Sequence, residues 1–158
     1  MKLRFLCANH RQWLTSHPSE AVHRYANSYE TGWHLSQRDQ WEDALPHMGC
    51  AFETAEILMT TRAIAPAGAL EWFVQSLAGL VEILLKLDRT TTCIELYQAA
   101  AERLRQEANQ KISPELEAFI YLHITRLNRE RRQLHEGVTW PVAAFALADS
   151  KRGDIVYH

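Results

Sequence analysis

Residues 25–59 decide the fold and read YANSYETGWHLSQRDQWEDALPHMGCAFETAEILM. The polar run QRD at 37–39 separates two stretches that each carry apolar residues at helical spacing. This pattern predicts one helix that ends near Ser36, a tight turn, and a second helix that begins at Trp41. The stretch is therefore expected to fold as an antiparallel helical hairpin, and the fold expected for the whole chain is all-α.

Small residues are spaced so that the two helices of this hairpin can approach closely. Helix axes come within about 8 Å of each other only where the facing side chains are short. Gly32 is followed twelve positions later by Ala44, and Ala44 is followed seven positions later by Ala51. Larger side chains would fill the space around this contact: Leu35, Met48, Phe52.

The same spacing returns further along the chain, with twelve residues from Val81 to Cys93 and seven from Cys93 to Ala100. Together the two sets resemble the tetratricopeptide repeat, a helix-turn-helix unit of about 34 residues that stacks into a right-handed solenoid. The chain departs from that family where Ser28 replaces a large apolar residue, where Val81 replaces a glycine, and where Ala51 and Ala100 lie 49 residues apart. The resemblance implies six or seven helices in antiparallel hairpins, as a solenoid or as a compact bundle.

Turn and cap residues outline the remaining helices, and residues 1–150 are expected to form one domain. Helices are predicted over 2–14, 18–36, 41–59, 67–87, 91–109 and 114–136, with a short one over 141–148 and a loosely held tail over 151–158. Pro46 lies inside the third helix, so that helix either kinks or begins its regular part near Leu45. The 67–87 helix is the most apolar and is expected at the centre, with its polar residues in one stripe: Glu71, Gln75, Glu82, Lys86.

Buried faces are also predicted for the two ends of the chain. The helical period over 2–14 would bury Leu3, Leu6, Cys7, His10 and Leu14. The helix that Ser113 caps is expected to bury Leu116, Phe119, Ile120, His123, Leu127 and Leu134, and to end at Gly137. All three cysteines, Cys7, Cys50 and Cys93, lie on apolar stripes and are expected to behave as small buried hydrophobes.

Composition excludes several classes of function. The 158 residues carry a formal net charge of −2 and are 47% hydrophobic, which gives no reason to expect nucleic acid or an anionic membrane as partner. The sequence contains no run of 18 apolar residues, its N-terminal residues predict no signal peptide, and its three scattered cysteines predict no disulfide framework. A cytoplasmic protein is therefore expected.

Candidate metal and catalytic residues are few. His47, Cys50 and Glu53 lie three residues apart, and a small helical enzyme or metal-binding bundle that uses His34, His47 and Cys50 is one alternative. No second ligand cluster and no nucleophile or phosphate-binding motif accompanies them, so no catalytic residue, metal or cofactor is predicted.

The preferred function is a non-enzymatic protein-interaction module of the adaptor or chaperone kind. In the family that the chain resembles, the first helix of each hairpin lines a concave groove. Eight residues would hold a peptide or helix of a partner there: Ala26, Tyr29, Trp33, Gln37, Gln75, Ala78, Glu82, Lys86. Aromatic anchors beside polar groups suit such a groove, although Tyr29 and Trp33 could equally be core residues. A homo-oligomeric structural protein, such as a homodimer, is the other alternative.

Overall fold

The computed structural model describes residues 3–137, and all regular secondary structure in that range is helical. The helices are α1 (Ala8–Ser16), α2 (Pro18–Ser36), α3 (Trp41–Thr61), α4 (Pro66–Lys86), α5 (Thr90–Ala108) and α6 (Pro114–His135). The prediction of an all-α fold is thus confirmed. The helix expected over 141–148 and the tail expected over 151–158 lie outside the described residues.

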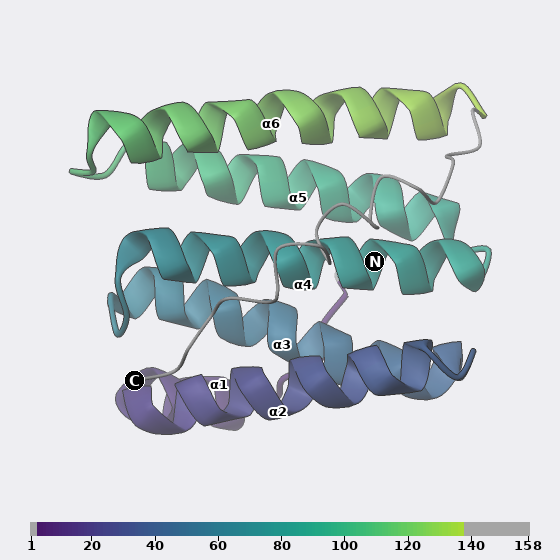
Figure 1. Cartoon of the computed structure of the whole chain (residues 1–158), viewed down its shortest axis with the longest axis horizontal. Coiled ribbons are helices and arrows are strands. Elements are labelled where there is room, and N and C mark those ends of the chain that lie inside the picture. Colours follow the sequence, from purple (N-terminus) through teal and green to yellow (C-terminus); the bar gives the residue numbers. More distant parts are fainter. Residues whose placement is uncertain (1–2, 138–158) are drawn as a thin grey trace.

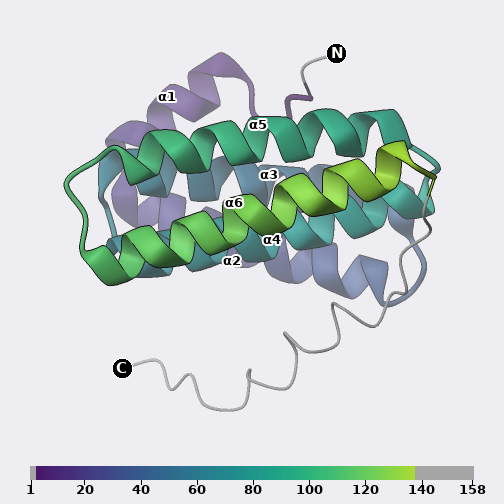
Figure 2. The same cartoon turned by 90° about the horizontal axis from the view of Figure 1, so that it is seen from above.

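The helices are arranged in two layers (Figures 1 and 2). One layer holds α2, α4 and α6 side by side, all running in the same direction, and the other holds α3 and α5 running in the opposite direction. The short helix α1 packs at the side of α2 and α3. As expected from its apolar sequence, α4 is central: it packs on α3 and α5 and touches α2.

The layer of α2, α4 and α6 repeats at a fixed interval along the chain. Each of these helices begins with a proline, at Pro18, Pro66 and Pro114, so the interval is 48 residues in both cases. Proline suits this position because the first helical amide has no partner inside the helix. The five buried residues of α2 each have a buried counterpart 48 positions later in α4: Ala21 and Ala69, Tyr25 and Phe73, Ser28 and Ser76, Gly32 and Leu80, Ser36 and Leu84.

The turns that join the helices of each hairpin are also equivalent. Asp39 follows α2 and Asp88 follows α4, and both adopt a positive φ, of 58° and 55°. Aspartate tolerates this left-handed conformation better than most residues. The residue after each aspartate donates its amide to the carbonyl five positions earlier, at 3.0 and 2.8 Å. The turn predicted at 37–39 is confirmed. The 48-residue interval is longer than the 34-residue tetratricopeptide unit because α2 to α5 are each 19 or 21 residues long.

The close contact predicted between α2 and α3 centres on Gly32. A β-carbon built on Gly32 would lie 3.0 Å from the backbone nitrogen of Met48, so the backbones of the two helices approach each other with no room for a side chain at this position. Ala44 and Ala51 are fully buried. The helix α3 begins at Trp41 and continues through Pro46, so the alternative in which its regular part begins near Leu45 is wrong.

At the N-terminus, the predicted helix over 2–14 is too long. Residues 3–7 are not helical, and α1 begins only at Ala8. Leu6 and Leu14 are buried as predicted, but Cys7 is exposed, and of the cysteines only Cys93 is fully buried. The reason is that the amides of this segment bind a side chain of α3 instead of forming a helical turn.

The face that α6 buries is narrower than predicted. Ile120 and Leu127 are buried as expected, together with Ile124 and Glu130, but Phe119 is 41% exposed. Leu116, His123 and Leu134 are only half-buried. A helix at the edge of the stack packs on one neighbour, α5, and therefore covers only a narrow stripe.

By length and composition, α4 is the one described helix that could cross a membrane. Half of the most apolar 18-residue window of this helix is buried inside the structure.

Candidate functional site

Seven of the eight predicted partner-binding residues lie within α2 and α4, which are neighbours in one layer, and Gln37 directly follows α2 (Figure 1). Ala26, Gln37 and Lys86 are exposed. The other five are half-buried: Tyr29, Trp33, Gln75, Ala78, Glu82. We call these eight residues the α2–α4 face. The structure thus brings together, on adjacent parallel helices, residues that the sequence separates by almost 50 positions.

Stacked aromatic rings join α2 to α4 beside this face. The ring of Tyr25 lies flat on Trp72, with centroids 4.4 Å apart and planes 1° from parallel, and its hydroxyl donates to the carbonyl of Trp72 at 3.0 Å. Tyr29 also stacks on Tyr25, at 5.7 Å between centroids. Buried aromatic stacks of this kind hold their rings in fixed positions. Tyr29 therefore belongs to a row of three rings that spans both helices.

Charged groups of both signs lie at one end of the α2–α4 face. The ammonium group of Lys86 lies 5.5 Å from the ring centroid of Trp41, within the range of a cation–π contact. Burial raises the pKa of Glu82, and the charge of Lys86, one helical turn away, partly offsets that shift. A half-buried acid, a lysine and an aromatic ring therefore lie at the end of α4 and the start of α3.

The residues of the metal alternative have other partners. His34 is exposed and pairs with Glu30, and His47 is exposed on α3. The Cys50 thiol donates to the carbonyl of Phe5 at 3.9 Å, and burial raises its pKa, which disfavours the thiolate that a metal needs. Within residues 3–137, no group of three or more His, Cys, Asp or Glu side chains is placed to hold a metal ion.

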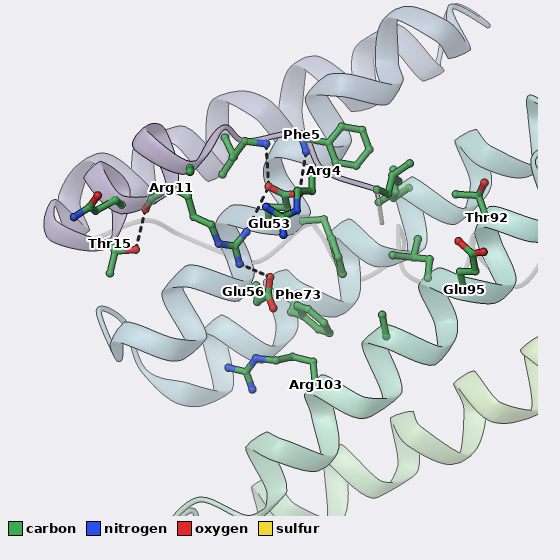
Figure 3. Close-up of a pocket in the computed structure, with 18 residues that line it drawn as sticks. Arg4, Phe5, Arg11, Thr15, Glu53, Glu56, Phe73, Thr92, Glu95 and Arg103 are labelled. Carbon is green, nitrogen blue, oxygen red and sulfur yellow. Dashed lines mark hydrogen bonds and ion pairs between the residues drawn. The ribbon is translucent and has the colours of Figure 1, made fainter. Parts of the chain in front are cut away.

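A cleft on the other side of the molecule was not predicted from the sequence (Figure 3). It lies between α3 and α5, with α4 beneath, and residues 3–6 form part of its wall. Its volume is about 770 Å³, which falls in the range of ligand-binding sites. Its apolar lining includes Phe52, Phe73, Leu80 and Leu96, and its polar lining includes Arg4, Glu56, Glu95 and Arg103.

One buried carboxylate, Glu53, organises the wall of this cleft. Its two oxygens accept hydrogen bonds from the backbone amides of Phe5 and Leu6, each at 2.9 Å, and one oxygen lies 3.5 Å from the Arg11 guanidinium (Figure 3). Glu53 is only 6% exposed, so it satisfies two amides that no helix provides for. A local sequence signal existed: Glu53 directly follows the apolar residues Ala51 and Phe52 of α3.

A second buried polar cluster lies between α5 and α6. Burial and the nearby Glu130 carboxylate raise the pKa of Tyr97, and Arg126 donates to Glu130 at 2.7 Å. Burial, and then Arg126, lower the pKa of His123, while Glu130 acts in the opposite sense. These polar groups interact with one another inside the contact between α5 and α6, which gives the cluster a structural role.

A scan against protein-family models, a search of curated proteins and a search of solved structures each found no match to this chain.

Proposed function

We propose that this protein is a non-enzymatic, cytoplasmic protein-interaction module that binds a peptide or helix of a partner protein on the α2–α4 face. The proposal carries over the resemblance to tetratricopeptide repeats, in which the first helices of successive hairpins form the binding surface. The observation that carries it is the position of Tyr29 and Trp33, half-buried on α2, with Gln37 directly after that helix and Glu82 and Lys86 on the neighbouring helix α4.

Two properties of the face support binding. First, the stack of Tyr25, Tyr29 and Trp72 holds the surface in place before a partner arrives, and this preorganisation lowers the entropy lost on association. Second, half-buried aromatic rings rimmed by polar groups are the usual anchors of protein interfaces, because their rings supply contact area and the rim excludes water.

Trp33→Ala should weaken partner binding by about thirtyfold, because truncating an aromatic anchor at an interface typically costs about 2 kcal/mol. Lys86→Ala should weaken it only a few-fold, because charges at the rim contribute little to affinity. The partner is first identified by pull-down and mass spectrometry, and its dissociation constant is then measured for each purified variant by titration calorimetry.

The control variant is Arg132→Ala, an exposed residue at the far end of α6 that should leave the affinity unchanged. Circular dichroism checks that each variant is folded. If Trp33→Ala unfolds the protein, Trp33 is a core residue and the face loses its anchor. If Trp33→Ala stays folded and binds as tightly as the wild type, the partner binds elsewhere.

Self-association is a second candidate function, and one observation favours it. Four large apolar side chains of the described range are more than a third exposed, and three of them lie close together on the outermost helix: Phe119, Tyr121 and Leu122, at 41, 49 and 67%. An exposed apolar cluster of this kind marks a contact surface.

If α6 mediates a dimer, Leu122→Glu should reduce the mass measured by light scattering from about two chains to one. A desolvated charge in an apolar interface is strongly unfavourable, so the shift should be complete at micromolar concentration. A wild-type mass of one chain over the same concentration range would eliminate self-association as the function.

A further inference from the structure

The cleft between α3 and α5 is long and narrow, because polar bridges join the two helices near both of their ends. At one end Arg103 of α5 donates to the Thr60 hydroxyl of α3 at 3.2 Å. At the other end Arg89, directly before α5, pairs with Glu42 of α3 at 3.5 Å. Between these bridges α5 lines the cleft from Thr92 to Arg103, which is about 16 Å of helix. The cleft therefore suits an elongated ligand better than a compact one.

Apolar side chains that water can reach line the middle of this cleft. Phe52 of α3 is half-buried and packs against the buried Phe73 of α4, with 4.9 Å between the ring centroids. Opposite, α5 contributes Leu96, which is 8% exposed, and Ala99, which is exposed. Covering apolar surface of this kind is favourable because water is released from it. The part of a ligand that lies here should be apolar.

The wall that residues 3–6 form is fixed before any ligand arrives. The Glu53 carboxylate accepts the amides of Phe5 and Leu6, each at 2.9 Å. The Phe5 ring lies against Gly49 so closely that a β-carbon on that residue would overlap the ring. A wall that is already in place lowers the entropy lost on binding. These residues therefore act as part of the cleft and stay where they are when it is filled.

Three arginines line the cleft, and they differ in their partners (Figure 3). The guanidinium of Arg11 lies 3.5 Å from Glu53 and 2.7 Å from Glu56. Arg103 pairs with a carboxylate of its own helix at 3.2 Å. Arg4 is exposed, and within residues 3–137 its side chain has no hydrogen bond or ion pair. One positive charge beside the apolar lining is thus available to a ligand.

We propose that the α3–α5 cleft binds an elongated amphiphile with a single carboxylate, such as the anion of a medium-chain fatty acid. Its alkyl chain lies on Phe52, Leu96 and Ala99, and its carboxylate pairs with Arg4, whose guanidinium can donate two parallel hydrogen bonds to it. A phosphate head would bring nearly two negative charges, and the second would face Glu95 in the same cleft. This site is separate from the α2–α4 face, so either proposal can fail without the other.

The test titrates the full chain with octanoate, decanoate and dodecanoate in a calorimeter, each below the concentration at which it forms micelles. Each methylene group that enters the cleft should raise the affinity about fourfold, so each added pair should raise it about fifteenfold. Dodecyltrimethylammonium has a chain of the same length and a positive head. It should bind at least tenfold more weakly than dodecanoate, because Arg4 repels it.

Two variants with a matched control identify the contacts. Ala99→Phe places a ring in the cleft at an exposed position and should weaken dodecanoate binding at least tenfold. Gln98→Phe adds the same ring at the next residue, which is also exposed but does not line the cleft, and should leave the affinity unchanged. Arg4→Gln should abolish the preference for dodecanoate over dodecyltrimethylammonium, an effect that a purely structural role of Arg4 would not produce.

Nuclear magnetic resonance locates the ligand on the wild-type protein. Dodecanoate should shift the methyl signals of Leu96 and Ala99 and leave that of Ala26, on the α2–α4 face, in place. Shifts at Ala26 alone would assign the amphiphile to the other face and overturn the proposal.

The proposal is also overturned if dodecanoate shows no saturable binding, if the two phenylalanine variants weaken binding equally, or if Arg4→Gln keeps the preference for the carboxylate. Dodecyl phosphate that binds more tightly than dodecanoate would overturn the assignment of the head group. Circular dichroism checks that each variant is folded. If Ala99→Phe is unfolded, the result for Arg4→Gln decides, since Arg4 is exposed and lies outside the helices.

Discussion

Glu53→Ala should lower the free energy of unfolding by about 2–4 kcal/mol, because a buried polar group that loses its hydrogen-bond partner costs about 1–3 kcal/mol. Two such groups lose theirs here, the amides of Phe5 and Leu6, and Leu6 is buried where water cannot replace the carboxylate. Urea denaturation followed by circular dichroism measures the change.

Glu56→Ala is the matched control for this prediction. Glu56 is one helical turn from Glu53 and pairs with the same arginine, Arg11, but neither partner is buried. A partly exposed ion pair contributes about 0–1 kcal/mol, so this variant should be nearly as stable as the wild type. Equal losses for the two variants would mean that the amide hydrogen bonds contribute nothing beyond the ion pair.

Gly32→Ala should destabilise the protein by about 1–3 kcal/mol, which is the usual cost of forcing extra atoms into a packed contact. The nearest atom to the new methyl group would be the backbone nitrogen of Met48, at 3.0 Å. Backbone cannot rotate away as a side chain can, so α2 and α3 must move apart along their whole contact. The loss is measured by urea denaturation.

The other glycines in helices provide graded controls for this second prediction. At Gly79 the new methyl group would meet the flexible end of Met48, its sulfur and methyl at 2.9 Å, which can change rotamer at little cost. At Gly68 the nearest atom is 3.9 Å away, so Gly68→Ala should stabilise α4 by about 0.5–1 kcal/mol. A loss at Gly68 as large as that at Gly32 would contradict this account.

Much of the fold could be predicted from the sequence because its determinants are local. The spacing of Gly32, Ala44 and Ala51 indicated the close helical contact, and the polar run at 37–39 indicated the turn. Ser113 with Pro114 marked the start of α6, where the serine side chain accepts the amide of Leu116. These signals work because caps, turns and helical faces involve residues only a few positions apart.

The binding of residues 3–7 to Glu53 could not be predicted in the same way, because its two backbone hydrogen bonds join residues 47 and 48 positions apart. Leu3 and Leu6 are spaced like one helical face, but the same spacing is compatible with an extended segment whose amides bind elsewhere. The available clues were Gly49 and Glu53, a glycine and an acid inside α3. The role of these two residues can be recognised only once residues 3–7 are known to lie against α3.

The limited contact between α4 and α5 has a consequence for cooperativity. Helices α5 and α6 pack mainly on each other. The contact of α4 with α5 is much smaller than the contact of α4 with α3. In proteins built from stacked helical units, the free energy of unfolding is close to the sum of the stability of each unit and of each interface between neighbouring units. Partial unfolding is therefore expected to separate the helices at the weakest interface. Between consecutive helices from α2 to α6, the least extensive contact is the one between α4 and α5. Because α3 and α5 are the two walls of the cleft, separation of α5 from α4 would widen the cleft.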